Sequence, residues 1–155
     1  MTGWLIAAFV ATTLVAPVGA ESTKVSIFVG PQTRDGFVDV DTGVLDSIKD
    51  IRDELRSSKR FVLVPTEAAA TIVLTVVGRR TAGQSGSVGV PIAGMLMMLP
   101  IKRRAIDTVL RVGSYEKAIT SEDDNNDQWK ASAKQAVRDV IAWVEANRAV
   151  LAQVK

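Results

Sequence analysis

The sequence predicts an α+β domain of two layers, in which two helices pack on one face of a mixed sheet of four to five strands. Two observations carry this prediction. Short β-rich apolar runs stop at Gly or Pro, and two longer segments repeat apolar residues at helical spacing. The expected order along the chain is strand, helix, strand, strand, long apolar loop, strand, strand and helix.

Residues 1–20 are predicted to form a secretory signal peptide. Residues 4–18 carry no charge, and this apolar stretch is shorter than the roughly 20 residues that a membrane span needs. Pro17 is followed by small residues at the positions that signal peptidase reads, which places cleavage after Ala20. The mature protein is then a single domain of residues 21–155, periplasmic or secreted. An uncleaved amino-terminal anchor and a buried first helix are the alternatives.

The first half of the mature chain is predicted to contain a strand, a helix and a second strand. Residues 23–30 are a β-rich run, and residues 37–40 are either a short edge strand or an extended approach to the helix. Asp41 or Thr42 caps this helix. Residues 60–64 form a strand parallel to the first. The helix presents one apolar stripe, made of Val44, Leu45, Ile48, Ile51 and Leu55.

The second half is predicted to contain three strands and a long helix. Residues 71–77 are almost wholly apolar, which predicts a central strand covered on both faces. Residues 105–112 and 115–120 are two further strands joined by a tight hairpin turn. The acidic residues 122–127 form a solvated loop before the last helix, residues 128–152. Its buried stripe is made of Trp129, Ala133, Val137, Val140, Ile141, Val144 and Leu151, with Trp143 between this stripe and the solvent face.

The composition excludes several classes of function. The net charge is near +2, and few aromatic residues accompany the basic clusters, so nucleic-acid binding is not expected. The chain contains no His and no Cys, so the commonest zinc ligands, the usual neutral-pH general base and a thiol nucleophile are absent. We therefore predict no catalytic residues, no metal, no cofactor and no lipid-anchored cysteine. An enzyme that depends on two carboxylates is the competing class.

The segment between the third and fourth predicted strands is the most unusual feature. Residues 81–101 carry no charge, and residues 88–101 are apolar throughout, with basic residues on both sides. An exposed apolar patch of this size marks an interaction site, and basic residues beside it favour anionic lipid headgroups. The alternative is that Leu96, Met98 and Ile101 extend strands and fill the core beneath the helices. The predicted contact residues are Val90, Ile92, Met95, Leu96, Met97, Met98 and Leu99, with a basic flank of Arg79, Arg80, Lys102, Arg103 and Arg104.

Residues 45–78 carry a resemblance to known envelope domains. An amphipathic helix is followed by the apolar run of residues 60–64, an Ala-rich turn, and Ile72, Leu74 and Val76 before Gly78. This order resembles the strand-helix-strand-strand core of the amino-terminal domain of the periplasmic TolB protein and of the CsgG-like domains of curli secretion. The resemblance implies a fold, an envelope location and an assembly role rather than catalysis.

The resulting hypothesis is an exported, non-enzymatic interaction module of the bacterial cell envelope whose contact surface includes residues 88–101. Its partner is either an unidentified protein or a lipid surface. A carboxylate-dependent enzyme and a structural assembly subunit that adds strands at a sheet edge are the alternatives.

Overall fold

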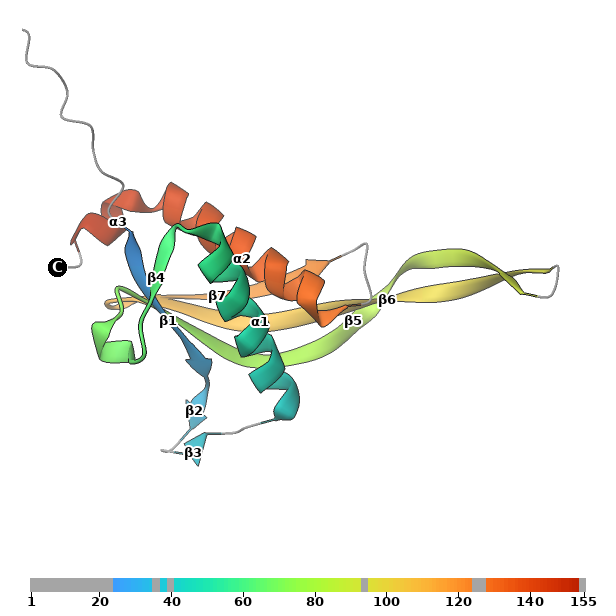
Figure 1. Ribbon diagram of the computed structural model, residues 1–155, viewed down its shortest axis with the longest axis horizontal. Coiled ribbons are helices and arrows are strands. Elements are labelled where there is room, and N and C mark those ends of the chain that lie inside the picture. Colours follow the sequence, from blue (N-terminus) through green and yellow to red (C-terminus); the bar gives the residue numbers. More distant parts are fainter. Residues whose placement is uncertain (1–23, 35–36, 39–40, 93–94, 124–127, 154–155) are drawn as a thin grey trace, which may run out of the picture.

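The protein is a five-stranded mixed sheet with two main helices, as the sequence predicts (Figure 1). The computed structural model describes residues 24–34, 37–38, 41–92, 95–123 and 128–153. The predicted signal peptide and residues 124–127 of the predicted acidic loop lie outside them. The strands are β1 (Val25–Pro31), β2 (Thr33–Arg34), β3 (Phe37–Val38), β4 (Phe61–Leu63), β5 (Ile72–Ile92), β6 (Met95–Val112) and β7 (Tyr115–Asp123). The helices are α1 (Thr42–Ser58), the 3-10 turn η1 (Glu67–Ala69), α2 (Trp129–Ala146) and α3 (Arg148–Gln153).

The sheet order is β4-β1-β5-β6-β7, and the first three of these strands run parallel. The predicted parallel pairing of the first two strands is therefore confirmed. Helix α1 makes the crossover between them, and its start is fixed because the Asp41 carboxylate accepts a hydrogen bond of 2.9 Å from the Gly43 amide. Lys59 ends the helix in the left-handed conformation, with a φ of 55°.

Helices α1 and α2 lie together on one face of the sheet, and the core fills the space between the layers (Figure 1). Side chains alternate along a strand, so Ile72, Leu74 and Val76 of β5 all point into this core and are fully buried. Val77 points away from it and is exposed. The prediction that this strand is covered on both faces is therefore wrong for Val77, because the helices cover only one face.

The prediction of a long loop is wrong, because residues 88–92 and 95–101 are paired strand. Strands β5 and β6 form one continuous antiparallel hairpin, from the pair Val73 and Arg111 to the pair Ile92 and Met95. The β-branched residues Val88, Val90 and Ile92 in this segment favour a strand. The ribbon also has irregular register near Gly78 and between Thr81 and Gly86, where β-bulges bend a strand.

The carboxy-terminal half follows the prediction with three corrections. The predicted last helix is interrupted at Asn147, between α2 and α3, and Glu122 and Asp123 of the predicted acidic loop belong to β7. Gly113 has a φ of 56° in the predicted turn between β6 and β7. In the last helix, Trp143 is buried rather than set beside the solvent face, because its ring stacks on Tyr115 with the centroids 5.4 Å apart. In α1, Leu45 of the predicted stripe is exposed. Among the described residues, no helix is both long enough and apolar enough to cross a membrane.

Candidate functional site: the β5–β6 hairpin

The far half of the β5–β6 hairpin extends beyond the rest of the sheet. Strand β1 pairs with β5 only as far as Val76, and β7 pairs with β6 only from Arg104 onward. Residues 82–92 and 95–103, here called the distal hairpin, therefore pair only with each other within the described part of the chain. Figure 1 shows this ribbon projecting past the ends of both main helices.

The tip of the distal hairpin, defined as Met95, Leu96, Met97 and Met98, is apolar and exposed. These four side chains are between 50% and 73% exposed. Because side chains alternate across a strand, Met95 and Met97 lie on one face of the ribbon, and Leu96 and Met98 lie on the other. Leu96 lies close over β5, since a Cβ atom at Gly89 would be 3.2 Å from it. The tip is therefore apolar on both faces, and the alternative in which these residues fill the core is wrong.

The remaining predicted contact residues belong to the same ribbon. Val90 pairs with Met97, Ile92 with Met95, and Leu99 with Val88. The hairpin register therefore brings together residues from both ends of the predicted contact segment. The side chains of Val90, Ile92 and Leu99 lie outside the described part of the structure.

Two arginines of the predicted basic flank are held against one indole where the hairpin leaves the domain. The Arg79 guanidinium carbon lies 4.5 Å from the centre of the Trp129 ring, and that of Arg104 lies 5.1 Å from it. Arg79 also packs on the start of α1, where a Cβ atom at Gly43 would lie 2.2 Å from its side chain. Because Gly43 has no side chain, it leaves space for this guanidinium.

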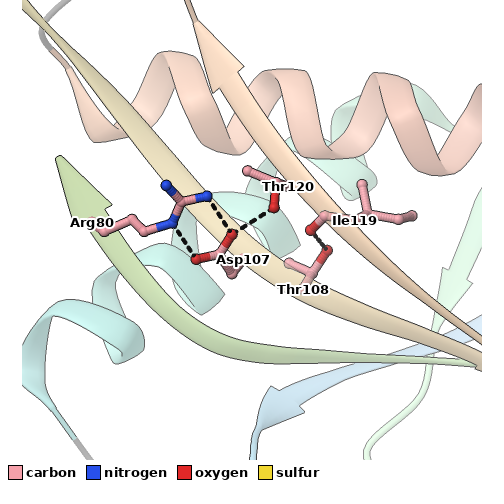
Figure 2. A network of polar contacts seen from close by, with 5 residues as sticks. All are labelled: Arg80, Asp107, Thr108, Ile119 and Thr120. Carbon is pink, nitrogen blue, oxygen red and sulfur yellow. Dashed lines mark hydrogen bonds and ion pairs between the residues drawn. The ribbon is translucent and has the colours of Figure 1, made fainter. Parts of the chain in front are cut away.

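Arg80 belongs to a polar network on the open face of the sheet (Figure 2). Its Nε donates a hydrogen bond of 2.9 Å to Asp107 Oδ2, and the Thr120 hydroxyl donates one of 2.7 Å to Asp107 Oδ1. Partial burial pushes the pKa of Asp107 upward, but the hydrogen bonds from Arg80 and Thr120 and the Arg80 charge outweigh it, so the pKa lies below its usual value. The same hydrogen bond and the charge of Asp107 raise the pKa of Arg80 above its usual value. Beside this network, the Thr108 hydroxyl donates to the Ile119 carbonyl at 3.3 Å.

The predicted basic flank is therefore brought together in space, but its arginines contact side chains of the domain. Arg103 lies 3.5 Å from the Glu122 carboxylate, and Arg79 lies 3.9 Å from that of Asp46. Lys102 is exposed. Since carboxylates stand beside these guanidinium groups, the flank presents much less net positive potential than five basic residues imply.

A shallow cavity of about 280 Å³ lies on the open face of the sheet, away from the tip. Two of its lining residues are acidic, Glu67 from η1 and Glu116 from β7. Arg111 of β6 forms an ion pair of 2.6 Å with Glu67, and both side chains are nearly half exposed. No sequence pattern predicts this cavity, because only the tertiary fold brings η1 beside β6 and β7.

Neither a scan against protein-family models nor a search of the curated proteins found a match. The resemblance to the TolB amino-terminal and CsgG-like domains therefore stays a prediction. In the described residues, no group of three or more acidic side chains is arranged to hold a metal ion.

Proposed function

We propose that the protein is an exported, non-enzymatic interaction module of the cell envelope whose tip contacts a lipid surface. One observation carries this proposal: the described side chains of the tip are apolar on both faces of a projecting ribbon. A ribbon that docked on a flat protein surface would need only one apolar face. A ribbon that enters an apolar medium is surrounded by it, which favours apolar side chains on both faces.

The dimensions of the tip suit insertion to the depth of the headgroup and acyl boundary. Four strand residues from Met95 to Met98 span about 10 Å at the usual rise of a strand. Interfacial elements enter to a depth of about 5–10 Å. Deeper insertion would place the unpaired backbone groups at the edges of the ribbon in hydrocarbon, where each costs several kcal/mol. The lipid contact is therefore expected to be interfacial.

The electrostatics of the hairpin base predict only a weak preference for anionic lipid. The sequence alone suggested that the basic flank would attract anionic headgroups. The contacts of Arg79 with Asp46, Arg80 with Asp107 and Arg103 with Glu122 reduce that attraction. The apolar tip, rather than the flank, is expected to supply most of the binding free energy.

Vesicle flotation tests the proposal directly. The purified protein is floated with vesicles of phosphatidylcholine alone and of phosphatidylcholine with phosphatidylglycerol. A tip variant carries serine at all four tip positions, Met95, Leu96, Met97 and Met98. We expect the wild type to float with both vesicles and the tip variant to bind at least about tenfold more weakly, because the apolar area is lost.

The matched control replaces two exposed apolar residues elsewhere, Leu45→Ser on α1 and Val62→Ser on β4. It should float like the wild type. Failure of the wild type to float, or equal flotation of the tip variant, would overturn the lipid proposal. Self-association of the wild type without flotation would instead favour the assembly subunit that pairs strand edges.

The cavity on the open face is the best candidate site for the competing carboxylate-dependent enzyme. Glu67 and Glu116 are two carboxylates lining one hollow. A general acid of this kind is usually set in an apolar environment that raises its pKa. Here Glu67 is nearly half exposed and forms an ion pair with Arg111, so it does not lie in an apolar environment. The tip is therefore the better supported site.

A further inference from the structure

The methionines of the tip share one chemical property that its leucine lacks. Met95, Met97 and Met98 are the only methionines after Met1, and the chain has no cysteine. All three side chains are at least half exposed. A thioether is oxidised most readily where an oxidant reaches it, and no thiol of this chain competes for that oxidant.

We propose that the tip is a methionine oxidation site, and that oxidation weakens its contact with lipid. The second part of this inference rests on the proposed function. In the reaction, a sulfur lone pair attacks one oxygen of hydrogen peroxide, an S–O bond forms and the O–O bond breaks. The sulfur loses two electrons and becomes a sulfoxide, while the peroxide is reduced and leaves as water after proton transfer. Each methionine therefore gains one oxygen atom and consumes one peroxide.

The arrangement of the three methionines makes the effect large. Met95 and Met97 lie on one face of the ribbon and Met98 lies on the other, so oxidation places a polar sulfoxide on both faces. Leu96 is then the only tip side chain that stays apolar. The core is not affected, because none of the three tip methionines belongs to it. Oxidation should therefore change binding without unfolding the protein.

A triple variant separates oxidation from apolar character. Met95→Leu, Met97→Leu and Met98→Leu together keep the tip apolar but remove every oxidisable thioether from it. Wild type and variant are treated with hydrogen peroxide, mapped by peptide mass spectrometry, and floated with phosphatidylcholine vesicles. Free methionine in the same solution supplies the reference rate.

We expect all three wild-type methionines to gain one oxygen each, at rates within about threefold of free methionine, as exposed thioethers should. Peroxide should weaken wild-type flotation at least about tenfold and leave the leucine variant unchanged. The urea unfolding midpoint of the wild type should not move.

Each part of the inference can fail separately from the proposed function. Oxidation much slower than that of free methionine would overturn the oxidation site, whatever the flotation result. Equal flotation of wild type before and after complete oxidation would overturn the claim that oxidation weakens lipid contact, while leaving lipid contact itself intact. Absence of flotation by both untreated proteins would overturn the proposed function and the claimed effect of oxidation on it. The mass spectra would still decide whether the tip is an oxidation site.

Discussion

The two halves of β6 differ in environment although they belong to one strand. Residues 104–111 pair with β5 on one edge and β7 on the other, and α2 covers one of their faces. Within the residues that the structure describes, residues 95–103 pair with β5 alone. Leu110 is fully buried, whereas Leu96 is 70% exposed. The same residue type in the same strand is core in one half and surface in the other, so neighbouring elements rather than hydropathy decide its role.

The boundary between the two halves coincides with the polar contacts at the hairpin base. Arg104 begins the half that pairs with β7 and lies on the Trp129 ring. Arg80 pairs across the open face with Asp107. These contacts tie the ribbon to α2 and to the sheet at the place where the core ends. Beyond them, the tip contributes apolar surface without contributing to the core.

The largest expected difference between the halves is in stability. Leu110→Ala should lower the free energy of unfolding by about 2–5 kcal/mol, because it leaves a cavity in the core. Leu96→Ala should change it by less than about 0.5 kcal/mol, since that side chain is already in solvent. Urea unfolding of the two variants measures both values. Similar losses in the two variants would mean that the tip packs as core.

A smaller effect is expected from the ion pair on the open face. The pKa of Asp107 is lowered in the folded protein, so its carboxylate contributes stability above the usual carboxyl pKa. That contribution is lost as the pH falls through the lowered value. Asp107→Asn, which removes the charge, should therefore be less stable than the wild type at neutral pH, with a gap that closes in acid.

Urea midpoints measured from neutral to acidic pH give the size of that gap. Thr120→Val, which removes one hydrogen bond to Asp107 but keeps the Arg80 pair, is the matched control and should show a smaller gap. A gap for Asp107→Asn that stays constant or widens in acid would contradict the assignment of a lowered pKa.

The fold class was predictable because periodicity reports directly on local structure. The spacing of Val44, Ile48, Ile51 and Leu55 places one buried stripe on α1, and the structure confirms it. The length of β5 was not predictable in the same way. Its distal residues are small, apolar and uncharged, a pattern that fits a loop, a buried strand or an exposed ribbon equally well.

The exposure of the tip followed from the sequence, but its geometry did not. The absence of charge over residues 81–101 led to the prediction of a contact segment, and the tip residues Met95 to Met98 are exposed. The ion-pair partners of the basic flank were not predictable from the sequence, because Asp46, Asp107 and Glu122 come from three different elements. Only the tertiary fold brings those carboxylates to the hairpin base.

A single labelled position tests the central claim, which is that the tip is outside the core and contacts lipid. The chain has no cysteine, so Leu96→Cys creates a unique site for an environment-sensitive thiol dye, and Val62→Cys on β4 is the exposed control. Both cysteines should label rapidly in the folded protein. On addition of phosphatidylcholine vesicles, the emission of the dye at position 96 should shift to the blue, and that at position 62 should not. A cysteine at position 96 that labels only after unfolding, or a dye there that does not respond to vesicles, would contradict the account.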